Sequence, residues 1–106
     1  MTVLDTLKAV NAYPVQHSTL TSICARRGVD PDVEATQEIL LGTAYRLARA
    51  DLLLWFAAAP NVSQGGQSFS FSEYERKQLR AEGLAIIEEL EDEKTKHLYG
   101  YKGSRL

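Results

Sequence analysis

The segment PNVSQGGQSFSFSEYER, residues 60–76, limits how this chain can fold, because it separates two long stretches that have the apolar spacing of helices. Pro60 ends the first stretch, since proline lacks a backbone N–H and its ring clashes with the preceding helical turn. Ser72 and Glu75 have the spacing of a capping box, which marks the first turn of a new helix. The segment is therefore an insert with a defined start and end.

A short β-hairpin is predicted inside this insert. Residues 65–66 are two glycines between polar flanks, which is a signal for a two-residue hairpin turn. Residues 68–72 alternate serine with phenylalanine, so that Phe69 and Phe71 share one face of a strand. We expect residues 61–64 to pair with residues 67–71.

Two shorter helices are predicted near the N-terminus. The first covers residues 2–12, where a capping-box spacing is followed by apolar residues at helical intervals. Ser18 or Thr19 has the position of a cap for the second helix. Gly28 supplies the left-handed conformation with which many helices end.

A third, long helix is predicted before the hairpin. Asp30 has the position of its cap and Pro31 that of its first residue. From there to residue 59 nothing breaks the pattern except a lone Gly42, which predicts about 28 residues and roughly 40 Å of helix. The apolar surface widens toward Trp55, so we expect that end to be deeply buried or part of an interface.

The last helix is predicted over residues 73–96, and Gly83 in its apolar stripe indicates a close approach to another helix. These elements predict a mainly α-helical bundle of about four helices, with one short hairpin (residues 61–71) between the two longest helices. A chain of 106 residues has the length of one domain, which we assign to residues 1–96. Residues 97–106 are expected to form a flexible C-terminal tail.

Charge and cysteine content narrow the possible classes of protein. Twelve basic and fourteen acidic residues give no overall attraction to nucleic acid or to an anionic membrane. Cys24 is the only cysteine, which excludes an internal disulfide and a thiol metal cluster and suggests a buried thiol in a reducing compartment. No window reaches about 18 apolar residues and the N-terminus lacks a basic region, so we expect a soluble protein without a signal peptide.

Catalysis and metal binding are not predicted. His17 and His97 lie near opposite ends of the chain without an acid or nucleophile beside them, and we interpret both as surface residues. Ser63 lacks the context of a catalytic serine, and the glycine turn lacks the motif of a phosphate loop. The acidic run at residues 88–93 lacks calcium-loop spacing and is interpreted as a solvated helix face. We expect no enzyme activity, no cofactor and no metal.

Two functional classes stay open as alternatives, a DNA-binding regulator and a small enzyme or toxin–antitoxin component. The order helix, turn, helix, hairpin is that of a winged-helix DNA-binding regulator. Against it, the would-be recognition helix begins with Asp32, Glu34 and Glu38, whose charges oppose an approach to phosphates, and the hairpin has no Lys or Arg. The other alternative is a small enzyme or a toxin–antitoxin component, which would require a concave polar pocket.

The hairpin itself allows two interpretations. In one, Phe69 and Phe71 cover the protein's own core. In the other, these rings and Trp55 are buried against a neighbouring protein and strand pairing sets the register. The second is possible because the opposite face is polar and residues 61–72 carry no charge that would block strand addition.

Residues 48–76, ARADLLLWFAAAPNVSQGGQSFSFSEYER, resemble a pattern in small phage and prophage proteins of gut Bacteroidales. The pattern has the form A-D-L-x-x-W-x-x-x-P-N-V-S-E-G-G-x-S-x-S-F-S-x-x-x-R. This chain has four residues in place of three between Trp55 and Pro60, and Gln64 stands where an acid is usual. The order of elements is similar to that of the helical head–tail connector (adaptor) proteins of tailed phages. Those proteins form rings below the portal, with subunits side by side around the DNA channel.

The resemblance implies a structural head–tail connector subunit that oligomerises as a ring and bridges portal and tail proteins, in the bacterial cytoplasm during assembly and then in the virion. From the charge balance, we expect neither a membrane nor a specific nucleic acid sequence as partner. Ala48 and Asp51 would support the hairpin, with a salt bridge from Asp51 to Arg76 as one possibility. The implied interface residues are Val62, Gly65, Gly66, Phe69, Phe71, Trp55 and Arg76.

Overall fold

The computed structural model describes residues 1–99 of the chain, apart from the side chains of Gln64 and residues 92–99. This part of the chain contains five helices and a two-stranded antiparallel sheet between the two longest helices, which confirms the predicted fold class. None of these helices is long and apolar enough to cross a membrane. The elements are α1 (Val3–Lys8), α2 (His17–Arg27), α3 (Gln37–Leu40), α4 (Thr43–Ala58), β1 (Val62–Gln64), β2 (Gln67–Phe69) and α5 (Glu73–Tyr99).

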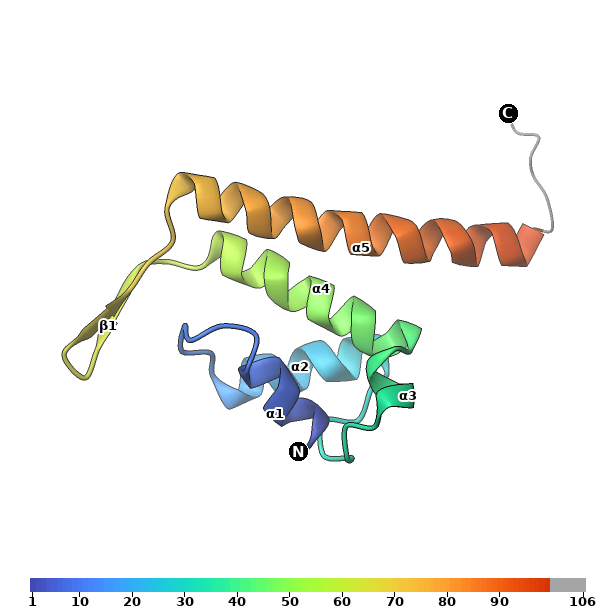
Figure 1. Cartoon of the computed structure of the whole chain (residues 1–106), viewed down its shortest axis with the longest axis horizontal. Helices are drawn as coiled ribbons and strands as arrows, with labels where there is room; N and C mark the ends of the chain where they lie inside the picture. The colour runs from blue at the N-terminus through green and yellow to red at the C-terminus, as the bar shows by residue number, and fades with distance from the viewer. Residues whose placement is uncertain (100–106) are drawn as a thin grey trace.

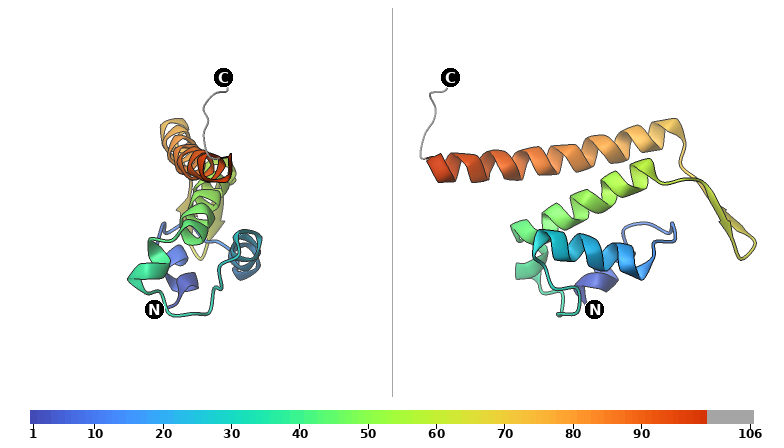
Figure 2. Two further views of the ribbon diagram at one scale, coloured as in Figure 1. Left: turned by 90° about the vertical axis from the view of Figure 1, so that its right-hand side faces the viewer. Right: turned by 180° about the vertical axis from the view of Figure 1, so that it is seen from behind.

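α4 is the central helix of the fold (Figure 1). α5 runs antiparallel along one side of α4, while α2 and α1 lie on the other side (Figures 1 and 2). The hairpin extends from the end of the bundle where α4 stops and α5 begins. α5 therefore packs on α4 with one face only.

α1 begins as predicted but ends early. The Asp5 backbone N–H donates to the Thr2 hydroxyl at 3.2 Å, and the Thr2 N–H donates to the Asp5 carboxylate at 3.0 Å, which completes the capping box. The helix stops at Lys8. The side chain of Asn11 then accepts a hydrogen bond from the Tyr13 N–H at 2.9 Å, which holds this segment in a turn.

α2 ends as predicted, with Gly28 in the left-handed conformation at a φ of 76°. Glycine adopts this conformation without the steric cost that a side chain would bring. The helix begins at His17, and neither Ser18 nor Thr19 acts as its cap.

The long helix predicted from Pro31 to residue 59 is wrong, because the structure contains a turn, the short α3 and then α4 in its place. Thr36 caps α3, since its hydroxyl accepts from the Ile39 N–H at 3.3 Å. Gly42 is the residue before α4 and has extended backbone, with a φ of −74° and a ψ of 157°. It separates two helices and does not lie inside one.

The N-terminus explains why the predicted helix does not begin at Pro31. The backbone N–H groups of Val3 and Leu4, in the first turn of α1, have no partner inside their own helix. They donate to the carbonyls of Val33 and Pro31, each at 3.0 Å. The Ala35 N–H in turn donates to the Met1 carbonyl at 2.9 Å. These long-range bonds hold residues 31–35 out of a helix.

The core is built around α4 and the inner faces of α1 and α2. The end of α4 is buried as predicted, while Trp55 itself is half-buried. Cys24 is fully buried, and burial, followed by the charge of Asp30, raises the pKa of its thiol. The largest fully buried side chains are Phe56, Leu7, Leu20, Leu52, Val3 and Cys24.

The predicted close helix approach at Gly83 is confirmed. A Cβ added to Gly83 would lie 3.0 Å from the carbonyl oxygen of Ala50 and 3.0 Å from Cγ of Leu54. Two exposed ion pairs also connect α4 and α5, Arg46 with Glu89 at 3.3 Å and Arg49 with Glu82 at 3.7 Å. Pairs this exposed contribute about 0–1 kcal/mol each, so close packing dominates this contact.

α5 begins with the predicted capping box. The Ser72 N–H donates to the Glu75 carboxylate at 2.8 Å, and the Glu75 N–H donates to the Ser72 hydroxyl at 3.1 Å. The helix continues through Tyr99, beyond its predicted end at residue 96. The rest of the predicted tail, residues 100–106, lies outside the described residues.

Candidate protein-interaction site

The hairpin predicted from the paired glycines is present, but its strands are shorter than predicted, because residues 61, 70 and 71 lie outside the pairing. Gly65 has a φ of 58° and Gly66 a φ of 80°, which suits the two-residue turn that matches the twist of paired strands. The turn sets the register of the two strands. Val62 lies opposite Phe69, Ser63 opposite Ser68, and Gln64 opposite Gln67.

Phe69 and Phe71 both pack against Tyr13 of the same chain. The Phe71 and Tyr13 rings are stacked with centroids 5.4 Å apart, and the Phe69 ring meets Tyr13 edge to face at 6.4 Å. Phe56 lies 5.9 Å from Phe71 on the inner side. The two rings thus cover the protein's own core, the first of the two interpretations, although both are only half-buried.

Tyr13 joins the hairpin to the helical bundle, and no motif in the sequence marked it. Its side chain is 5% exposed, and its hydroxyl donates to the carbonyl of Pro60 at the base of the hairpin. The Trp55 ring approaches it edge to face at 5.7 Å. An aromatic residue beside a proline in a short connection suggests burial, but such a pattern does not name the partner.

Arg76, in the first turn of α5, holds the end of α4 and the base of the hairpin together. Its guanidinium donates to the carbonyls of Ala57 at 3.1 Å and Ala59 at 2.6 Å, and to the side-chain oxygen of Asn61 at 3.1 Å. The last carbonyls of a helix have no partner within it, so a cation at this place satisfies them. The guanidinium carbon also lies 5.8 Å from the Phe71 ring centroid.

The salt bridge suggested between Arg76 and Asp51 is wrong. Asp51 accepts two hydrogen bonds from Arg27, at 2.7 Å from Nε and 2.9 Å from Nη2, and Arg26 lies 3.7 Å away. Hydrogen bonding to Asp51 raises the pKa of Arg27. Asp51 thus joins α4 to α2 and does not contact the hairpin base through Arg76.

Two hollows lie near these residues. The larger, about 810 Å³, is an open groove between α2 and α4, beside the Arg27–Asp51 pair. Its serine hydroxyls have no general base beside them, because the only carboxylate in the lining is engaged by two arginines. The second, about 430 Å³, lies between β1 and the segment after Tyr13, and is lined by Pro14, Val15, Gln16, Val62 and Ser63.

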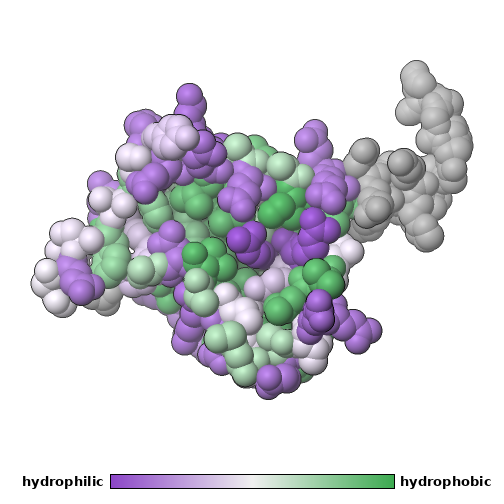
Figure 3. All heavy atoms as spheres, viewed as in Figure 1, coloured by the Kyte–Doolittle hydropathy of each residue, from purple (hydrophilic) through white to green (hydrophobic). Residues whose placement is uncertain are grey.

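The outer surface of the hairpin is polar and uncharged. Ser63, residues 65–68 and Ser70 are exposed, and Figure 3 shows the end of the hairpin in white and purple. Within residues 1–99, neither strand pairs with a third strand. The hairpin therefore presents two open edges whose backbone groups are available to another chain.

Other chemistry has little support among the described residues. They contain no group of three His, Cys, Asp or Glu side chains placed to hold a metal ion. His17 is exposed, as expected, whereas the side chain of His97 is not among those described. α4 is covered by α2 and α5, so it has no free face with which to enter a DNA groove as a recognition helix.

The fold and the site define a small helical protein whose hairpin insert is held by one tyrosine and one arginine. The chain belongs to a family described as "Family of unknown function (DUF6706)", whose model matches residues 1–97. No curated protein and no solved structure matches the chain.

Proposed function

We propose that this chain is a structural head–tail connector (adaptor) subunit of a phage or prophage, which forms a ring and bridges portal and tail proteins. The pattern in residues 48–76 and the order of elements support this role, because both resemble proteins of that kind. The observation that carries the proposal is the hairpin, which extends from the bundle with two open edges.

The hairpin is suited to strand addition by a neighbouring protein. A two-stranded hairpin is marginal in water by itself, and this one is supported only on its inner face. Each outer edge is a row of backbone groups that a further strand would pair. Charged side chains commonly protect such edges, and residues 61–72 include none.

The aromatic residues act in this contact by positioning the hairpin. Phe69 and Phe71 are engaged by Tyr13, so the inner face is already occupied by the chain itself. The neighbour would therefore bind the strand edges and the exposed outer face, including Ser63 and Ser68. The half-exposed rims of the two rings would add apolar contact at the margin.

The test uses the portal and tail proteins of the same prophage in a pull-down assay. Ser63→Lys/Ser68→Lys places two cations on the outer face of the hairpin, and we expect it to weaken binding by at least about tenfold, roughly 1.4 kcal/mol. Ser18→Lys/Ser22→Lys places the same charges on exposed residues of α2 and should bind like the unaltered protein. Full binding by the hairpin variant, or no binding by the unaltered protein, would overturn the proposal.

A further inference from the structure

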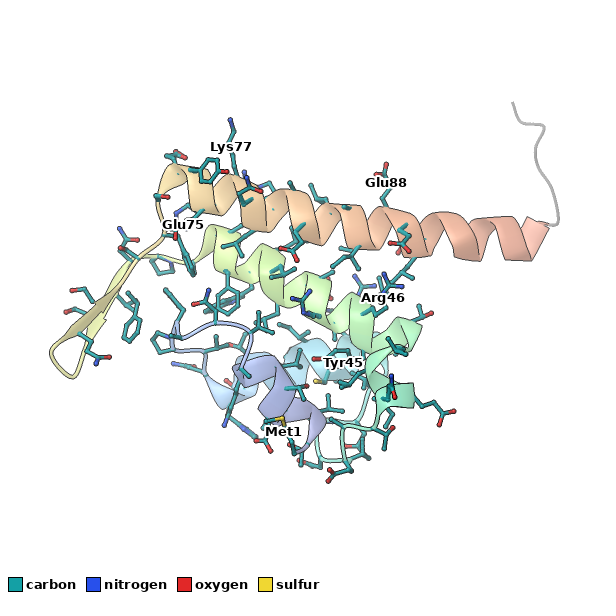
Figure 4. All side chains as sticks on the ribbon, viewed as in Figure 1. Met1, Tyr45, Arg46, Glu75, Lys77 and Glu88 are labelled. Carbon is teal, nitrogen blue, oxygen red and sulfur yellow. The ribbon has the colours of Figure 1, made fainter. Side chains whose placement is uncertain are left out.

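The face of α5 turned away from α4 carries exposed apolar side chains. Tyr74 is 69% exposed and Leu84 is 51% exposed. A shallow hollow of about 510 Å³ lies along this face, and α5 alone supplies its lining, which consists of Tyr74, Lys77, Gln78, Arg80, Ala81 and Leu84. In Figure 4, Lys77 and Glu88 point away from α4, so this face has no partner within the described chain.

Charge is distributed unevenly along this face. The exposed cations Lys77 and Arg80 lie toward the start of α5, and the exposed carboxylates of Glu88 and Glu91 lie toward its end. No ion pair is formed by any of the four within residues 1–91. The charge of Glu91 also contributes, after Asp51, to the raised pKa of Arg27 on α2, whereas Lys77, Arg80 and Glu88 have no such effect on another described residue.

The spacing of these charges is symmetric about Leu84. Arg80 and Glu88 each lie four residues from it, and Lys77 and Glu91 each lie seven residues from it. Intervals of four and seven residues return to the same side of a helix. If a second α5 is laid antiparallel across the first at Leu84, each cation of one copy therefore meets a carboxylate of the other.

We propose that this face of α5 binds the same face of a second copy of the chain, with the two helices antiparallel about a two-fold axis at Leu84. Leu84 of each copy packs against Leu84 and Ala81 of the other, and four charge pairs flank this centre. A parallel arrangement would place like charges together, so charge selects the antiparallel one.

This contact between two copies does not depend on the proposed role in a virion. A two-fold contact closes on two copies, so it describes the free protein, whereas a ring requires a head-to-tail contact made elsewhere. A single helix pair buries less than roughly 1,200 Å², the range of weak and transient interfaces. We expect a dimer that dissociates between about 10 μM and about 1 mM and weakens as salt increases.

The test is sedimentation equilibrium of the full chain with charge-reversed variants. In Lys77→Glu/Arg80→Glu, all four positions are acidic, and in Glu88→Lys/Glu91→Lys all four are basic. Like charges then oppose one another in both homodimers, so each variant alone should dissociate at least about tenfold more readily than the unaltered protein. Mixed in equal amounts, the two variants should form a heterodimer, because every pair is again complementary.

A matched control separates this contact from general attraction between oppositely charged proteins. Asp32→Lys/Glu38→Lys has the same net charge as Glu88→Lys/Glu91→Lys, but its changes lie on exposed residues away from α5. Mixed with Lys77→Glu/Arg80→Glu, it should form less heterodimer than Glu88→Lys/Glu91→Lys does, because only two of the four charge pairs are then complementary. The inference would be overturned by a strictly monomeric unaltered protein, by variants that dimerise normally alone, or by an equal mixture that stays monomeric.

Discussion

Gly83 of α5 lies so close to Ala50 of α4 that a methyl group at Gly83 would be 3.0 Å from the Ala50 carbonyl oxygen. The absence of a side chain at Gly83 thus sets how closely the two longest helices approach. Leu54 fills the space on the other side, with its Cγ 3.0 Å from the same point. Helix propensity alone predicts that Gly83→Ala stabilises the protein, whereas this close contact predicts that it destabilises the protein.

Gly83→Ala should destabilise the protein by about 1–2 kcal/mol, because overpacking against a backbone oxygen outweighs the gain of about 1 kcal/mol in helix propensity. The measurement is urea unfolding of the variant beside the unaltered protein. Ala85→Gly, at an exposed position of the same helix, isolates the propensity effect and should cost about 1 kcal/mol. A more stable Gly83→Ala protein would show that α4 and α5 are not in close contact here.

Tyr13 contributes through both its ring and its hydroxyl. Tyr13→Phe loses only the hydrogen bond to Pro60 and should cost about 1 kcal/mol of unfolding free energy. Tyr13→Ala also removes the ring that supports Phe71 and should cost about 3 kcal/mol or more. Unfolding followed by tryptophan fluorescence measures both. Equal losses in the two variants would mean that the ring does not support the hairpin.

Arg76 should stabilise the base of the hairpin through its three acceptors. Arg76→Ala is expected to cost about 1.5–3 kcal/mol, and Arg76→Lys should restore only part of it because an ammonium lacks the planar fork. Amide hydrogen exchange should accelerate in residues 61–71 in both variants. The exposed neighbour Gln78→Ala serves as control, and exchange in Arg76→Ala no faster than in this control contradicts the expectation.

Asp5 should make the stability of the N-terminus depend on pH. The backbone N–H of Thr2, followed by its hydroxyl, lowers the pKa of Asp5 from its ordinary value of 3.8. A lowered folded-state pKa stabilises the protein above the unfolded pKa, and this stabilisation is lost as the pH falls through the folded value.

The melting temperature of Asp5→Asn should therefore lie below that of the unaltered protein near pH 7, and the two should converge in strong acid. Thr2→Ala keeps the backbone donor, so it should remove only part of this dependence. A difference between Asp5→Asn and the unaltered protein that stays constant with pH would rule out this role for the carboxylate.

The helix ends and turns that depend on residues close together in the sequence could be predicted. The Thr2–Asp5 and Ser72–Glu75 capping boxes, the exit at Gly28 and the hairpin turn all involve groups within a few residues of one another. Gly83 was interpretable as well, because a glycine inside an apolar helix stripe has few explanations besides close packing. Local steric and hydrogen-bonding rules decide each of these features.

The loss of helix at residues 31–35 was not predictable, because the groups that cause it belong to residues 1–4. Local helical spacing continued through this region, and only the distant N-terminus supplied the competing backbone bonds. Likewise, the sequence contains the arginines and Asp51 but not their pairing, which depends on how α2 lies against α4.

The sequence alone determined that a hairpin stands between two helices, since Pro60, the paired glycines and the Ser72–Glu75 capping box act locally. The direction in which the hairpin faces depends on how the helices pack. That choice depends on Tyr13, which is far from the hairpin along the chain and meets Phe69 and Phe71 only after the helices have packed. An aromatic ring is buried by whatever surface the folded chain brings to it, and no local rule names that surface in advance.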